Sequence, residues 1–150
     1  MAKRLCTMLA AAALAVSSVA VSAADLSPVG RWRTLDDDTG AKTGVIEITL
    51  AGDTLQGRIV DMVMKPGENP DPVCLKCTGA DKNHPIMGLT ILKGLRRDGD
   101  VWDGGVILDP WTGNVYSSEV RLDETGTKLF VRGYLGISLL GRTETWIRDD

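Results

Sequence analysis

The amino-acid sequence predicts an all-β fold, and within that class an eight-stranded antiparallel up-and-down barrel. Short runs of alternating or β-branched residues recur along the chain, each bounded by glycine, aspartate or asparagine. Beyond the first two dozen residues, no apolar stripe with a 3.6-residue period persists. Successive strands joined by short turns must be antiparallel, and a long sheet removes its two exposed edges by closing on itself. A β-sandwich is the alternative architecture.

The first element is an export signal, predicted over residues 1–23. Lys3 and Arg4 give it a positive start, an alanine-, valine- and leucine-rich run follows, and Val21-Ser22-Ala23 offers the small residues that signal peptidase needs. This run is shorter and less apolar than a transmembrane helix, so we expect cleavage rather than an uncleaved anchor. The remaining residues, 24–150, are expected to form one barrel domain in the periplasm of a bacterium or outside its cell.

The charge balance of the exported part excludes one class of partner. Without Lys3 and Arg4, 15 basic and 20 acidic residues remain, a formal charge of −5. A nucleic-acid partner would require a basic face, so none is expected. The chain has no second apolar stretch of membrane-spanning length, so we expect no stable membrane insertion after the signal is removed.

The eight predicted strands follow in order, and tight turns rich in aspartate, asparagine and glycine connect most of them. The predicted strands are Gly30–Leu35, Gly44–Leu50, Thr54–Met62, Met87–Leu95, Val101–Leu108, Val115–Leu122, Lys128–Leu135 and Gly141–Arg148. An interior of eight strands is just wide enough for side chains or for one small ligand.

The last strand gives conflicting signals about which face points inward. Arg142, Glu144, Trp146 and Arg148 share one face by alternation. Either Trp146 lies outside on a charged surface, or Arg142 and Glu144 lie inside as a polar pair. The first arrangement is favoured here, because charged residues are normally exposed.

The longest interruption between strands, residues 63–85, contains Cys74-Leu75-Lys76-Cys77. A proline-rich loop lacks the helix N-terminus that activates a redox Cys-x-x-Cys pair, so we expect a structural disulfide between Cys74 and Cys77. Redox activity is one alternative. A zinc site that adds Asp81 and His84 is the other, but oxidised cysteines cannot bind metal and one Cys-x-x-Cys is half of the usual signature.

Two sets of motifs carry a resemblance to known proteins. Gly30-Arg31-Trp32 is similar to the Gly-x-Trp start of lipocalins, in which a late arginine packs over the tryptophan; Arg142 or Arg148 would take that place here. A longer series resembles the exported bacterial family called domain of unknown function 2147, which implies a lipocalin-like barrel and no established activity. The series comprises Cys74-x-x-Cys77, Asp81-Lys82-Asn83, Gly88-Leu89-Thr90-Ile91-Leu92, Trp102-x-Gly104-Gly105-x-Ile107-Leu108-Asp109-Pro110, Val131-Arg132-Gly133-Tyr134 and Gly136-x-Ser138-Leu139-Leu140-Gly141-Arg142-Thr143-x-Thr145-Trp146.

The sequence favours binding over catalysis. It has one histidine and no nucleophile-elbow or phosphate-loop motif, so we expect no catalytic residues, no metal and no cofactor. The hypothesis is a barrel that holds a small apolar or amphiphilic ligand, with Arg132, Tyr134, Arg142 and Trp146 as candidate contacts and the arginines facing an anionic head group. The alternative is an envelope interaction module with a filled barrel, whose contact surface is the 63–85 loop.

Overall fold

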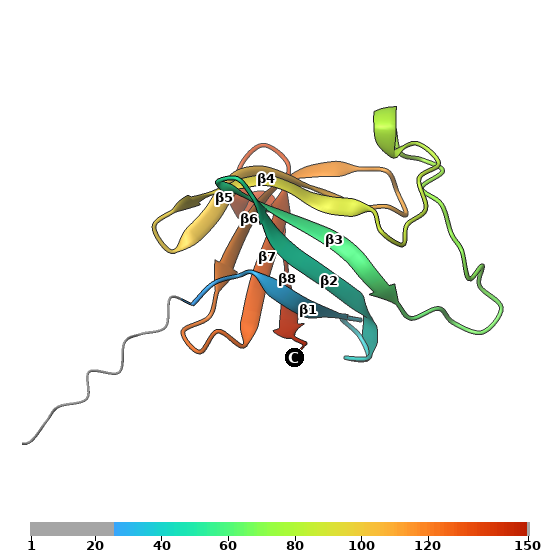
Figure 1. Ribbon diagram of the computed structural model, residues 1–150, viewed down its shortest axis with the longest axis horizontal. Coiled ribbons are helices and arrows are strands. Elements are labelled where there is room, and N and C mark those ends of the chain that lie inside the picture. The colour runs from blue at the N-terminus through green and yellow to red at the C-terminus, as the bar shows by residue number, and fades with distance from the viewer. Residues whose placement is uncertain (1–25, 150) are drawn as a thin grey trace, which may run out of the picture.

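The computed structural model describes residues 26–149, and its regular secondary structure is almost entirely β-strand (Figure 1). The strands are β1 (Gly30–Leu35), β2 (Lys42–Ala51), β3 (Thr54–Met62), β4 (Thr90–Asp98), β5 (Val101–Leu108), β6 (Val115–Leu122), β7 (Lys128–Tyr134) and β8 (Arg142–Arg148). Two short 3-10 helices, η1 (Gly79–Asp81) and η2 (Ser138–Leu140), lie in loops. The predicted signal peptide falls outside the described residues.

The eight strands form one closed antiparallel barrel in chain order. β1 pairs with β8 through Trp32 opposite Arg148 and Arg33 opposite Ile147, which joins the first strand to the last. Every other pairing connects strands that are neighbours in the sequence. The predicted up-and-down barrel is therefore confirmed, and the β-sandwich alternative is wrong.

The predicted strand boundaries are close, and the largest shift is in β4. This strand begins at Thr90 rather than Met87, because Gly88 has a left-handed φ of 87° and the amide of Leu89 bonds back to the carbonyl of Ile86. It also continues to Asp98, which pairs with Val101. The turn between β4 and β5 is therefore tighter than predicted.

Trp146 lies inside the barrel and only 2% of its surface is exposed, so the favoured outward placement is wrong. Arg142 and Glu144 share its face, but they lie at the open end of the barrel, where their charged groups reach solvent. The predicted alternation along β8 is confirmed, since these residues do share one face. Charged side chains can lie on the inner face here because this end of the barrel is open to solvent. The interior core also includes Trp32, Ile48, Leu55, Leu92, Leu95, Val120 and Leu129.

The long segment between β3 and β4 projects beyond one end of the barrel (Figure 1). An isolated bridge between Val73 and Pro85 and a bond from the Cys74 amide to the His84 carbonyl close it into a compact loop. The described part of the chain has no helix with the length and apolarity to cross a membrane.

Candidate functional site

One large cavity opens at the end of the barrel from which the β3–β4 loop projects. Its volume is about 1050 Å³, and it is lined by the ends of β1, β3, β5 and β7 and the beginnings of β2, β4, β6 and β8. The inward alternation of these strands makes its wall predominantly aliphatic. The aliphatic wall residues include Ile46, Ile59, Ile91, Ile107, Leu108 and Val131.

The opposite end of the barrel is closed by Trp32 and Arg148. The Arg148 guanidinium lies 4.2 Å from the centre of the Trp32 ring, within the range of a cation–π contact. The same group donates hydrogen bonds to the carbonyls of Ser27 and Gly126, at 2.9 and 2.6 Å. The N-terminal segment and the β6–β7 turn are thereby fixed across this end.

Gly30 has a steric reason to be glycine at the closed end. Its φ is 136°, and a Cβ atom there would lie 2.8 Å from Nη1 of Arg148. Of the two arginines expected to cover Trp32, the structure thus places Arg148 there, while Arg142 lies at the open end.

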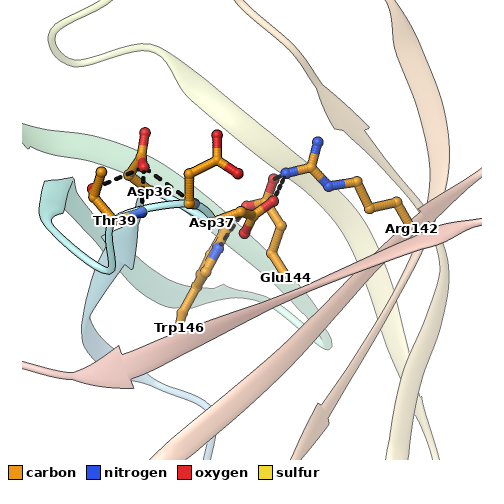
Figure 2. A network of polar contacts seen from close by, with 7 residues as sticks. Asp36, Asp37, Thr39, Arg142, Glu144 and Trp146 are labelled. Carbon is orange, nitrogen blue, oxygen red and sulfur yellow. Dashed lines mark hydrogen bonds and ion pairs between the residues drawn. The ribbon is translucent and has the colours of Figure 1, made fainter.

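A polar group of residues forms one side of the cavity mouth (Figure 2). Trp146 donates its indole N–H to Glu144 Oε2 at 3.0 Å, and Arg142 Nη2 lies 3.9 Å from Glu144 Oε1. The same Arg142 nitrogen bonds to the carboxylate of Asp37, from the β1–β2 turn. Arg142 is therefore shared between two carboxylates.

The β1–β2 turn that carries Asp37 is held by its neighbour Asp36. Oδ1 of Asp36 accepts hydrogen bonds from the Thr39 amide at 2.9 Å and from the Thr39 hydroxyl at 2.8 Å (Figure 2). The hydroxyl bond is the main reason that the pKa of Asp36 is lowered from its ordinary value. Asp37 is thus presented to Arg142 from an ordered turn.

A second carboxylate in the cavity, Asp61 at the end of β3, already has a partner. Lys42 Nζ lies 2.7 Å from Asp61 Oδ2, and this hydrogen bond lowers the pKa of Asp61. The pair lies near solvent, with both side chains partly exposed.

The disulfide loop packs beside the cavity. Cys74 and Cys77 are bonded to each other and buried, as the sequence predicts. Cys74 Sγ lies 3.1 Å from the Pro110 carbonyl oxygen, a contact without a hydrogen because the sulfur is oxidised. Gly113, with a φ of 74°, brings the β5–β6 turn against Lys76: a Cβ atom there would lie 2.2 Å from the Lys76 carbonyl oxygen.

The two other residues considered as metal ligands with the cysteines have separate roles. Asp81 Oδ2 lies 2.6 Å from Nζ of Lys93, and His84 Nδ1 lies 2.6 Å from the carbonyl oxygen of Pro85. Residues 26–149 contain no group of three or more metal-ligating side chains.

Three of the four candidate ligand contacts line the cavity: Tyr134, Arg142 and Trp146. Arg132 does not. Its guanidinium instead bonds to the carbonyl of Ser138 at 2.6 Å and to the hydroxyl of Thr143 at 2.8 Å, which fixes the β7–β8 loop. The strand alternation contained this signal, because Arg132 is directly next to the inward-facing Val131.

Glu144 and Asp37 were not among the candidate ligand contacts expected from the sequence. Glu144 was considered only as a possible interior partner of Arg142, although it shares a strand face with Trp146. Asp37 could not have been identified from the sequence, since nothing there connects it with Arg142, which is 105 positions away.

Comparisons with known proteins agree with the fold. Protein HP1028 from the human pathogen Helicobacter pylori, described as belonging to the lipocalin family, superimposes with a TM-score of 0.68. The two are 18% identical, and the match covers 81% of this chain and 82% of that one. No curated protein matches the chain. The model of a family described as "uncharacterized protein conserved in bacteria (DUF2147)" matches residues 30–148, so the chain belongs to the DUF2147 family.

Proposed function

We propose that this protein is an exported, non-catalytic container that holds one small apolar or amphiphilic molecule in its barrel. The observation that carries the proposal is the cavity of about 1050 Å³, open at one end and aliphatic within. Pockets that bury a small organic ligand have volumes from about 300 Å³ upward. A cavity of this size favours the container over an interaction module with a filled barrel.

The rim of the cavity suits the passage of an apolar molecule. Val63, Trp111, Leu135 and Leu140 line the mouth and are each more than half exposed. Exposed apolar side chains grouped at one place are typical of a surface that meets an apolar partner. Together with Tyr134 and Trp146, they are the proposed contacts of a ligand as it enters.

The container role is tested by filling the cavity. Ile107 lines it, whereas the adjacent Val106 is on the outer face of β5 and is 36% exposed. N-phenyl-1-naphthylamine, a neutral lipophilic fluorophore, should bind to the natural protein, and Ile107→Trp should weaken its binding at least about tenfold by occupying the space. Val106→Trp adds at least as much bulk outside and should leave binding unchanged. Absence of probe binding to the natural protein would refute the container.

Export is supported by the predicted signal and by the disulfide between Cys74 and Cys77, since oxidising compartments preserve such bonds. N-terminal sequencing of protein recovered from the periplasmic fraction should give a first residue at Ala24 or Asp25. Recovery of the full-length chain from the cytoplasm alone would contradict it.

A further inference from the structure

The charged side chains that line the cavity are mainly acidic. They are Asp61, Glu68, Asp109, Glu144 and Arg142, four carboxylates and one cation. The cation is shared between Glu144 and Asp37, which adds a further carboxylate to the mouth. Lys42 balances only Asp61. An anionic head group would therefore meet net repulsion here, contrary to the hypothesis from the sequence.

Aromatic rings are concentrated at the same place. Four of the seven aromatic residues of the chain line the cavity: Trp111, Tyr116, Tyr134 and Trp146. The face of an aromatic ring attracts a cation, and sites for quaternary ammonium groups are commonly built from such rings. Rings beside carboxylates match an organic cation better than a neutral or anionic group.

Glu144 is the carboxylate best placed to receive such a group. Its side chain is 46% exposed and lines the cavity. The indole N–H of Trp146 bonds to Oε2 at 3.0 Å, which places the edge of an aromatic ring beside the carboxylate. Oε1 has Arg142 at 3.9 Å, the limit of an ion pair, and that arginine is drawn to Asp37 (Figure 2).

We propose that the cavity selects an amphiphile with an ammonium head group, which contacts the carboxylate of Glu144 and the aromatic rings of the cavity wall while its apolar tail occupies the aliphatic interior. This inference rests on the proposed container function and specifies the chemical class of its ligand.

The test compares three amphiphiles that each carry a ten-carbon alkyl tail and differ in head group: decyltrimethylammonium, undecanoate and decanol. The measurement is displacement of N-phenyl-1-naphthylamine from the natural protein at neutral pH, with each amphiphile kept below its own micellar concentration. Decyltrimethylammonium should bind at least about fivefold more tightly than undecanoate, the ratio expected of one partly exposed charge pair with aromatic support.

Variants assign the preference to a residue. Glu144→Gln should weaken decyltrimethylammonium binding about fivefold and leave decanol binding unchanged, because only the charged head group meets the carboxylate. Arg142→Ala should strengthen decyltrimethylammonium binding by removing the competing cation. The matched control is Glu119→Gln on the outward face of β6, where Glu119 lies opposite Arg132.

The outcomes separate this inference from the container role. If all three amphiphiles bind equally, or if Glu144→Gln behaves like Glu119→Gln, the container stands and the ammonium assignment is overturned. Tighter binding of undecanoate that is lost in Arg142→Ala would overturn it in favour of an anionic head group. If neither the fluorophore nor any amphiphile binds, the container role fails and the assignment fails with it.

Discussion

Arg148 joins three parts of the closed end: the Trp32 ring, the carbonyl of Ser27 and the carbonyl of Gly126. Arg148→Ala should lower the free energy of unfolding by about 2 kcal/mol, because it removes a cation–π contact and leaves both carbonyls without their donor. Arg148→Lys should recover only part of this, since lysine lacks the planar fork that reaches both carbonyls. Urea unfolding measures both values.

Arg142→Ala serves as the matched control for that experiment, because its side chain is 70% exposed and its ion pairs lie in solvent. It should change stability by less than about 0.5 kcal/mol. Equal losses in the two alanine variants would contradict the distinction between the closed and open ends.

Asp123 makes the stability of the β6–β7 turn depend on pH. Its carboxylate accepts hydrogen bonds from the Thr125 hydroxyl at 2.6 Å and from the Lys128 amide at 2.9 Å, and these lower its pKa in that order of importance. A lowered folded-state pKa stabilises the protein above the unfolded-state pKa, and this stabilisation is lost as the pH falls through the folded value. Asp123→Asn should therefore be less stable than the natural protein at pH 7, and the difference should shrink below about pH 4.

The control for this titration is Glu124→Gln, an exposed residue in the same turn. It should give the same unfolding midpoint as the natural protein at both pH values. A difference between Asp123→Asn and the natural protein that stays constant down to about pH 2.5 would show that the hydrogen bonds, rather than the charge, matter.

At the level of single residues, the sequence identified two of the four aromatic residues of the cavity wall but not the charge of the site. Tyr134 and Trp146 were predicted from their position in the chain, and both line the cavity. The net charge of the cavity mouth depends on which cations are already paired with carboxylates. Arg142 is paired with Asp37, and this contact exists only in the folded barrel. Alternation along one strand cannot predict a contact between side chains 105 positions apart.

Among the elements, the β5–β6 turn and the disulfide loop support each other through Gly113. Gly113→Ala should destabilise the protein by about 2–4 kcal/mol, because a Cβ atom would overlap the Lys76 carbonyl and the backbone has a left-handed φ of 74°. It should also expose the disulfide, which is buried in the natural protein, to reduction. Thermal unfolding and the rate of reduction by dithiothreitol measure the two effects.

Gly40 is the matched control, since its φ is 68° but a Cβ atom at this position would have no neighbour within 4 Å. Gly40→Ala should therefore cost only the backbone strain, about 1 kcal/mol, and leave the disulfide protected. Equal reduction rates in both variants would mean that Gly113 does not hold the loop.

The strands were predictable because each is short, alternating and bounded by turn residues, as in β5 and β6, whose predicted limits match the structure. The fold of residues 63–89 was not predictable from the sequence. It depends on the disulfide, on a Val73–Pro85 bridge and on contact with the Gly113 turn. Those interactions join segments far apart in the sequence and have no periodic signature.

For the whole molecule, closure could be inferred because eight hairpin-linked strands otherwise leave two unpaired edges. The sequence did not indicate which end of the barrel stays open, because this depends on the segment before β1. Ser27 and Pro28 cover the closed end through their carbonyls, which accept bonds from Arg148 and from the Trp32 indole. The cavity therefore opens at the other end, beside the disulfide loop.

The seam between β1 and β8 closes the sheet into a barrel. Only Trp32 with Arg148 and Arg33 with Ile147 are in register there, whereas β2 and β3 pair from Gly44 to Ala51. Cysteines introduced at Arg33 and Ile147 should form a disulfide without rearrangement, because directly opposed residues have Cα atoms about 4.5–5.5 Å apart. Closing a loop of this length should stabilise the protein by up to about 5 kcal/mol.

The mismatched pair Arg33→Cys with Thr145→Cys tests the register, because Thr145 lies two residues from the position opposite Arg33. It should cross-link more slowly and stabilise less. Urea unfolding before and after mild reduction, with the natural protein as the reference for loss of the Cys74–Cys77 bond, isolates the effect of the new disulfide. If the matched pair stays reduced, or if both pairs cross-link equally well, β1 and β8 are not held in this register and the barrel does not enclose its cavity.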